Sequence, residues 1–247
     1  MTKAIKDQFK LALAQLNPVL GDIAGNVKKA RKARARAAEQ GVDLIAFTEL
    51  FLTGYPPEDL VLKPAFQKAA REACELLASD TQDGGPAMLM GLPWGEGAAV
   101  YNAVALLDSG RIEAVRYKYN LPNYGVFDEK RVFAPGPLPQ PIAFSGVKLG
   151  VPICEDIWTG DACDALAREG AELLIVPNGS PYWIGKQEVR YDVAKVRVAE
   201  TRLPLAYVNQ VGGQDELVFD GASFVLNGDG SVAVQLPAWE KALGITE

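Results

Sequence analysis

The sequence has 247 residues, of which 49% are hydrophobic and 23% charged, so it is long and apolar enough to bury a sizeable core and is not disordered. It contains no histidine, which excludes Ser-His-Asp and Cys-His catalysis, histidine metal sites and a histidine general base. The formal net charge of -6 argues against a broad nucleic-acid or membrane surface and favours small molecules or proteins as partners. Any catalysis must therefore use other groups.

Apolar runs of strand length alternate with helical stretches along the chain. In the first half, the pattern predicts a strand at 9–16, a helix at 26–40, a strand at 42–48, a helix at 64–79, a strand at 87–92, and a hairpin of 100–107 with 111–118. In the second half, it predicts a strand at 147–153, a helix at 161–168, a strand at 172–177, a helix at 187–202, a strand at 205–211, and a hairpin within 223–236. Parallel strands mixed with hairpins indicate one α/β domain, 1–247, in which helices cover mixed sheets.

The cysteines Cys74, Cys154 and Cys163 are widely spaced and form no CxxC pair. They suggest neither a disulfide framework nor a thiolate metal site, so we expect no metal and a reducing cytoplasmic location. The first ten residues are too polar for a signal peptide, and no apolar run reaches the roughly 18 residues that a membrane helix needs. We therefore expect a soluble, cytoplasmic protein.

Cys154 ends the apolar run 147–153 and is followed directly by Glu155 and Asp156. Sites in α/β proteins collect outside the carboxyl ends of strands, where the N–H groups of the next turn can lower the pKa of a thiol and stabilise an oxyanion. A lone cysteine at a strand end is, however, more often an inert packing residue. Both interpretations stay open from the local sequence.

Without histidine, a cysteine nucleophile needs another base and another positive charge, so carboxylates and lysines at strand ends are the candidates. Glu49 follows the strand 42–48, and Lys118 ends the second strand of the first hairpin. Taken singly, each is more typical of a solvated loop charge. Glu49 and Lys118 would form a catalytic site only if the fold placed them next to Cys154, and spacing along the chain does not show whether it does.

Three segments together resemble the nitrilase superfamily of carbon–nitrogen hydrolases. They are FTELFLTGYPPEDL at 47–60, KYNLPNYGVFDEKRVF at 118–133 and GVPICEDIW at 150–158, and they are most similar to the glutaminase domains of bacterial glutamine-dependent NAD synthetases. The resemblance runs from the first strand to the last hairpin. It implies a single-domain, four-layer α-β-β-α sandwich, with Glu49 as general base, Lys118 as cationic stabiliser and Cys154 as nucleophile.

The resemblance also implies which residues hold the amino-acid end of glutamine. Tyr124, Ser180 and Lys186 stand at the matching positions, and their hydroxyl and ammonium groups can bond an α-ammonium or carboxylate. Glu155, beside the nucleophile, offers the opposite charge for the ammonium, and Phe127 is expected to line the pocket. A polar loop before a helix is the alternative interpretation of Ser180 and Lys186.

The implied reaction converts L-glutamine to glutamate and ammonia through a cysteine thioester, without a cofactor. Many nitrilase relatives carry a second glutamate eight residues after the lysine, where this chain has Val126, and the nearby acids Asp128 and Glu129 have no assigned role. No segment resembles the nucleotide-binding loop SGGxDS of a synthetase domain. We therefore expect an NAD synthetase domain or subunit outside this chain to accept the ammonia, and we expect a homo-oligomer. The alternatives are an amidase for another small amide, or a module with little activity until its partner binds.

Overall fold

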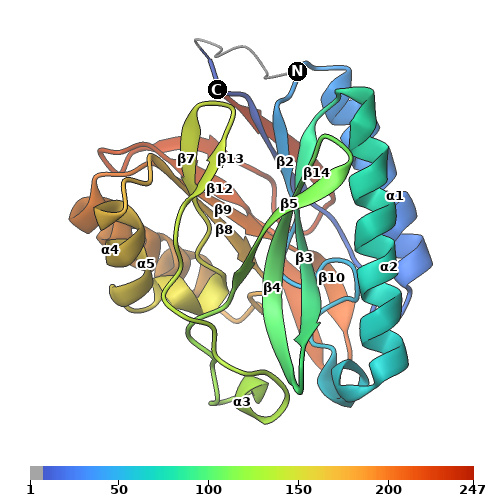
Figure 1. Cartoon of the computed structure of the whole chain (residues 1–247). Helices are drawn as coiled ribbons and strands as arrows, with labels where there is room; N and C mark the ends of the chain where they lie inside the picture. Colours follow the sequence, from blue (N-terminus) through green and yellow to red (C-terminus); the bar gives the residue numbers. More distant parts are fainter. Residues whose placement is uncertain (1–7) are drawn as a thin grey trace.

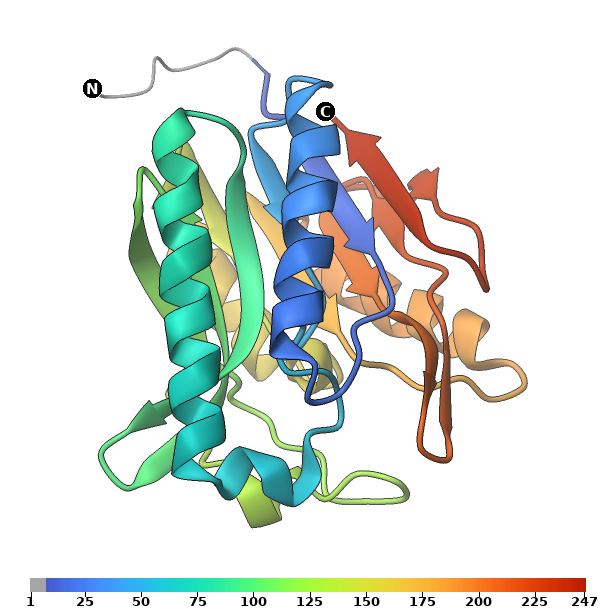
Figure 2. The same ribbon diagram turned by 90° about the vertical axis from the view of Figure 1, so that its right-hand side faces the viewer.

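The structure, a computed structural model, describes residues 8–247, and within that range two six-stranded sheets stack face to face (Figure 1). The first sheet has the order β14-β1-β2-β3-β4-β5 and the second β13-β12-β9-β8-β7-β6. Helices α1 and α2 cover the outer face of the first sheet, and α4 and α5 cover that of the second (Figures 1 and 2). This is the four-layer α-β-β-α sandwich that the resemblance implied.

The elements have the following bounds. The first sheet contains β1 (Leu11–Gln15), β2 (Leu44–Ala46), β3 (Ala87–Glu96), β4 (Ala99–Asp108), β5 (Arg111–Tyr117) and β14 (Ala242–Thr246). The second contains β6 (Ile142–Phe144), β7 (Val147–Gly150), β8 (Leu173–Asn178), β9 (Leu205–Asn209), β12 (Phe224–Leu226) and β13 (Val232–Gln235), and a separate hairpin joins β10 (Val211–Gln214) to β11 (Leu217–Asp220). The helices are α1 (Ile23–Ala38), α2 (Pro64–Asp80), α3 (Glu129–Val132), α4 (Asp161–Arg168) and α5 (Lys186–Thr201), with 3-10 turns at Glu58–Leu62, Thr81–Asp83 and Cys154–Ile157.

Alternating side chains along the strands build three apolar layers. On β8, Ile175 faces the core between the two sheets, whereas Leu174 and Val176 face α4 and α5. On the other side of the molecule, alanines of α1 such as Ala30 and Ala33 pack against the first sheet. A period of two on strands and about 3.6 on helices produces these faces, so the pattern in the sequence already determines which side of each element is buried.

Parallel strands at the centre of each sheet place their carboxyl ends at one edge of the molecule. In the first sheet β1, β2 and β3 are parallel to one another, and in the second β7, β8 and β9 are. That edge lies on the side of α3, away from the chain termini (Figure 1). Loops that follow parallel strands are the usual place for a site in such sheets.

The predicted elements are present, but several boundaries differ and some short elements were missed. Helix α4 has the predicted bounds, whereas α1 begins at Ile23 because Asp22, not a later residue, caps it by accepting a hydrogen bond from the N–H of Gly25 at 2.9 Å. The strand predicted at 205–211 divides into β9 and β10. The missed elements are the strands β6, β11 and β14, most of β10, and the short helix α3.

None of the helices within residues 8–247 combines the length and the hydropathy needed to cross a membrane.

Candidate active site

The buried charges Glu49 and Lys118 meet at the carboxyl edge of the first sheet. Glu49 follows β2 and Lys118 directly follows β5, and Lys118 Nζ lies 2.7 Å from Glu49 Oε1 with both side chains fully buried. The interpretation of each as a solvated loop charge is therefore wrong. Both charges shift the pKa of the Cys154 thiol, and Cys154 follows β7 in the other sheet. The structure thus brings Glu49, Lys118 and Cys154 together.

Glu129, which the sequence left without a role, is the fourth member of this cluster. It is the first residue of α3, and its carboxylate accepts hydrogen bonds from Lys118 Nζ at 2.8 and 2.9 Å. The hydroxyl of Tyr55 donates to Glu129 Oε1 at 2.9 Å. Glu129 stands eleven residues after Lys118, not eight, so the usual spacing pointed to Val126, which is exposed. The only signal in the sequence was an acid within the segment that carries the resemblance.

Three donors fix the carboxylate of Glu49. Oε1 accepts from Lys118 Nζ and from Asn102 Nδ2, both at 2.7 Å, and Oε2 accepts from the N–H of Gly179 at 2.8 Å. Asn102 belongs to β4 of the first sheet and Gly179 follows β8 of the second. Both sheets therefore orient the candidate base, and the fully buried carboxylate has the donors that an ionised group needs.

Cys154 occupies a sharp turn. Its φ of 47° lies in the left-handed region, which is uncommon outside glycine, and the 3-10 turn Cys154–Ile157 begins at this residue. Burial raises the pKa of the Cys154 thiol well above its usual value; the negative charge of Glu49 adds to this, and Lys118 opposes it. The turn at the strand end therefore does not produce a free thiolate at neutral pH. Ionising this sulfur requires a base beside it.

Lys118 and Glu129 shift each other's pKa in opposite directions. Burial lowers the pKa of Lys118, but the charges of Glu129 and Glu49 outweigh it and raise that pKa well above 10.5. Burial also raises the pKa of Glu129 to about 7, although Lys118 works in the other direction and Glu49 reinforces the rise. Lys118 therefore stays protonated, whereas Glu129 titrates close to neutrality.

Asp156 connects the turn at Cys154 to the chain that follows Lys118. Its Oδ1 accepts the backbone N–H groups of Tyr119 at 3.0 Å and Asn120 at 2.7 Å, and its Oδ2 accepts that of Ile153 at 2.8 Å. The side chain is fully buried. One carboxylate thereby sets the distance between two catalytic segments that come from different sheets, a role with no signal in the sequence.

The residues expected to bind the substrate lie on the loops around this cluster. The hydroxyl of Tyr124 donates to Glu155 Oε1 at 2.9 Å, and its ring meets that of Phe127 edge-on, with centroids 5.5 Å apart. Tyr124 is 53% exposed and so is accessible to a ligand. The Tyr124–Glu155 bond brings a hydroxyl and a carboxylate together beside the nucleophile.

Ser180 and Lys186 are both buried: Ser180 lies in the loop that precedes α5, as the alternative interpretation expected, whereas Lys186 is the first residue of that helix. The ammonium of Lys186 lies 4.3 Å from the ring centroid of Trp158 and 5.4 Å from that of Trp183, which are cation–π distances. Burial lowers the pKa of Lys186, as does the charge of Arg190, while a thiolate at Cys154 and a carboxylate at Glu155 raise it.

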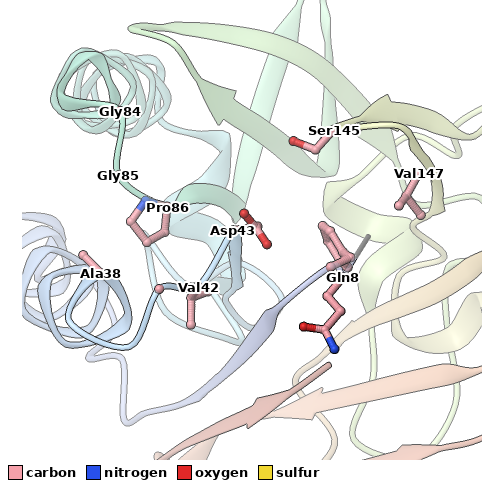
Figure 3. Close-up of a pocket in the computed structure, with 11 residues that line it drawn as sticks. Gln8, Ala38, Val42, Asp43, Gly84, Gly85, Pro86, Ser145 and Val147 are labelled. Atoms are coloured by element: carbon pink, nitrogen blue, oxygen red, sulfur yellow. The ribbon is translucent and has the colours of Figure 1, made fainter. Parts of the chain in front are cut away.

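A separate cavity of about 350 Å³ lies at the opposite edge, near the amino ends of the parallel strands (Figure 3). Its lining includes Asp43, Pro86, Ser145 and Val147. Asp43 accepts a hydrogen bond from the N–H of Lys10 at 3.0 Å. No cysteine or lysine lines this cavity among the residues that the structure describes, so we place the candidate active site at the Glu49–Lys118–Cys154 cluster instead. Within 8–247, no group of three or more Cys, Asp or Glu side chains is arranged to hold a metal ion.

A family model described as carbon-nitrogen hydrolase matches residues 10–247. The chain belongs to the carbon–nitrogen hydrolase family. Among relatives of this hydrolase, the glutamine-dependent NAD(+) synthetase of Rhodobacter capsulatus is 53% identical over 237 residues, which make up 96% of this chain and 43% of that protein. The corresponding protein of Thermotoga maritima is 44% identical over 227 residues, or 91% of this chain and 39% of that protein. The chain therefore spans less than half the length of these curated relatives.

Solved structures agree with the assignment of this hydrolase. The glutamine-dependent NAD+ synthetase from Acinetobacter baumannii, in complex with ADP, gives a TM-score of 0.91 at 40% identity, covering 96% of this chain and 45% of that one. An amidase of the nitrilase superfamily from Nesterenkonia AN1 gives 0.86 at 29% identity, covering 96% and 89%. One mutant of that amidase carries the acetamide moiety of fluoroacetamide covalently on its active site cysteine. The expected family and fold are confirmed.

Proposed function

We propose that this chain, as one glutaminase domain spanning 1–247, hydrolyses the side-chain amide of L-glutamine to glutamate and ammonia. The observation that carries the proposal is the fully buried Glu49–Lys118 pair beside the Cys154 thiol. Such a pair supplies a base and a positive charge without histidine. The similarity to glutamine-dependent NAD(+) synthetases supports glutamine as the substrate.

The proposed reaction proceeds in two halves. In the first, Glu49 takes the proton from the Cys154 thiol as sulfur attacks the amide carbon, and Lys118 with a backbone N–H of the turn stabilises the tetrahedral oxyanion. Glu49 then gives the proton to the departing ammonia, which leaves a thioester on Cys154. In the second half, water attacks the thioester while Glu49 accepts its proton, and the sulfur leaves with that proton as glutamate is released. The covalent adduct on the cysteine of the Nesterenkonia amidase supports a nucleophilic role for Cys154.

We assign the amino-acid end of glutamine to the surrounding loops. The carboxylate of Glu155 accepts hydrogen bonds from the α-ammonium, and the Tyr124 hydroxyl holds that carboxylate in place. Ser180 and Lys186 bind the α-carboxylate. Phe127 packs against Tyr124 and closes the apolar side of the pocket. In this proposal the reaction needs no cofactor. The ammonia goes to an NAD synthetase domain or subunit, and the hydrolase assembles as a cytoplasmic homo-oligomer.

Steady-state assays with glutamine, asparagine and simple aliphatic amides test this function. We expect glutamine to have the highest kcat/KM, and Cys154→Ala to abolish turnover of every substrate because no other group supplies the nucleophile. Cys163→Ala is the matched control, since Cys163 is a buried cysteine of α4 and should keep full activity. If glutamine were the poorest substrate, the glutaminase assignment would fall in favour of a small-amide amidase, the activity that the Nesterenkonia similarity favours.

A further inference from the structure

Arg190 is a fully buried arginine next to the proposed active site, and the reaction as described above does not use it. It lies on α5 and heads the set of largest fully buried side chains in the described part of the chain, with 1% exposure. An arginine cannot shed its charge, so burying one is costly unless hydrogen bonds and an opposite charge surround it. The contacts of Arg190 therefore indicate what it is for.

Its guanidinium is shared between an aspartate and the loop that follows β8. Arg190 Nη1 contacts both oxygens of Asp220, at 2.7 and 2.9 Å, and Asp220 is itself buried at the end of β11. On the other side, Nε donates to Ser180 Oγ at 3.1 Å and Nη2 donates to the carbonyl oxygen of Ser180 at 2.8 Å. The N–H of Ser180 is held in turn by Asn209 Oδ1 at 2.9 Å. Ser180 is thus fixed at its hydroxyl, its carbonyl and its amide.

The direction of the hydrogen bond at the Ser180 hydroxyl decides whether this hydroxyl can donate a hydrogen bond to a ligand. A guanidinium has donors only, so Ser180 Oγ must accept from Arg190, which leaves the serine proton available for another group. Burial raises the pKa of the neighbouring Tyr207, so its hydroxyl stays protonated and can donate to Ser180 Oγ. With Arg190 and Tyr207 both donating, the two lone pairs of Ser180 Oγ are filled and the serine proton is left for a ligand. A hydroxyl polarised by a cation behind it is suited to donate to an anion.

Ser180 lies beside α5, which carries two cationic side chains near its start, Lys186 and Arg190. Lys186 is the first residue of the helix that carries Arg190; burial lowers the pKa of its ammonium, and a thiolate at Cys154 raises that pKa. The carboxylate of Glu155, by contrast, is held by Tyr124. The amino-acid end of a substrate therefore meets a cationic group, Lys186, and an anionic group, Glu155, close to the nucleophile.

We propose that Arg190, held by Asp220, is a positioning residue that turns the Ser180 hydroxyl toward the substrate's carboxylate, so that the site selects amides bearing a carboxylate at the far end. The proposal rests on the glutaminase function above and adds the group that sets its specificity. Arg190 acts through Ser180 and does not touch the substrate.

Two analogues of glutamine separate the ends of the substrate. Glutaramate lacks the α-amine and 4-aminobutanamide lacks the α-carboxylate. We expect Ser180→Ala and Arg190→Lys each to raise KM for glutamine and glutaramate by about 10- to 100-fold, the range for a lost hydrogen bond to a charged group. The kcat/KM for 4-aminobutanamide should stay within about twofold of the unmodified enzyme, because this substrate has no carboxylate for Ser180 to bind.

The double variant distinguishes positioning from a general structural role. If Arg190 acts through Ser180, Arg190→Lys should raise KM no further once Ser180 is alanine. Equal losses on both analogues, or independent effects that multiply in the double variant, would overturn the proposal. Should Arg190→Lys fail to fold, as judged by thermal melting, Asp220→Asn loosens the same guanidinium and must show the same substrate-selective pattern. An unmodified enzyme that hydrolyses 4-aminobutanamide but neither glutamine nor glutaramate would instead refute the glutaminase function itself.

Discussion

At the scale of single residues, one buried ammonium lies between two buried carboxylates. Lys118 contacts Glu49 and Glu129 at 2.7 and 2.8 Å, so the three groups carry a net negative charge when all are ionised. Burial raises the pKa of Glu129 to about 7, and the negative charge of the nearby Glu49 adds to this rise because two buried carboxylates repel each other. The site therefore contains a group that titrates in the physiological range although the chain lacks histidine.

Replacing that group should change how stability depends on pH. The pKa of Glu129 is about 7 in the folded protein against 4.5 ordinarily, so the folded state binds this proton more tightly than the unfolded state. Its contribution to stability is full below about pH 4.5 and is lost as pH rises through about 7, a change of about 3 kcal/mol. Relative to Glu129→Gln, which cannot titrate, the unmodified protein should lose this amount between those pH values. Urea unfolding from pH 4.5 to 8 measures it, and parallel curves for the two proteins would contradict the raised pKa.

Individual site residues were hard to predict because local sequence does not reveal whether a charge is buried. Glu49 and Lys118 look like ordinary charges at strand ends, and only their resemblance to a family joined them to Cys154. Glu129 and Arg190 had no such signal, since each is buried by partners from distant elements: Lys118 and Tyr55 for the glutamate, Asp220 and Ser180 for the arginine. Whether a charged side chain is buried depends on its partners in the folded protein, and those partners come from segments far away in the sequence.

At the scale of elements, local signals predicted α1, α2, α4, α5 and the central strands well, but not the short α3. Pro64 starts α2 where the sequence placed it, and the hairpin β4–β5 forms around the expected turn. The strands that were missed are short or pair far along the chain: β14 completes the first sheet beside β1, with Thr246 opposite Leu11. Such pairing depends on tertiary contacts that periodicity over a few residues does not contain.

Strand β3 makes one close approach that supports the candidate base. A Cβ added to Gly91 would lie 2.3 Å from the carbonyl oxygen of Thr48 and 2.5 Å from the N–H nitrogen of Leu50, the two neighbours of Glu49. Because backbone atoms cannot give way easily, Gly91→Ala must push the segment that carries Glu49.

We expect Gly91→Ala to cost about 1 to 3 kcal/mol of stability through overpacking and to lower kcat about tenfold or more by displacing the base. Gly213→Ala in β10 is the matched strand control, because the nearest atom to its added Cβ is 3.8 Å away. Thermal melting and kcat with glutamine measure the two effects. Unchanged kcat in a folded Gly91→Ala variant would show that the close approach is not needed for catalysis.

At the scale of the whole molecule, the site is assembled across the two sheets. Glu49 and Lys118 follow strands of the first sheet, whereas Cys154 and Ser180 follow strands of the second. The apolar core between the sheets, which reaches from Leu13 to Cys154 itself, therefore fixes the distance between base and nucleophile. The helices pack on the outer faces of the sheets, so we expect them to stabilise the fold without setting that distance.

Two core truncations of similar size test this division. Ile175 of β8 lies in the core between the sheets, and Leu77 of α2 lies between helix and sheet, both with 0% exposure. Ile175→Ala and Leu77→Ala should each cost about 2 to 5 kcal/mol of stability, because each leaves a cavity. Only Ile175→Ala changes the packing between the halves of the site, so its kcat should fall about tenfold while that of Leu77→Ala stays within about twofold. The assays are run well below both melting temperatures, so that loss of folded protein does not contribute. Equal kcat values in the two variants would mean that the loops hold the site together without the core between the sheets.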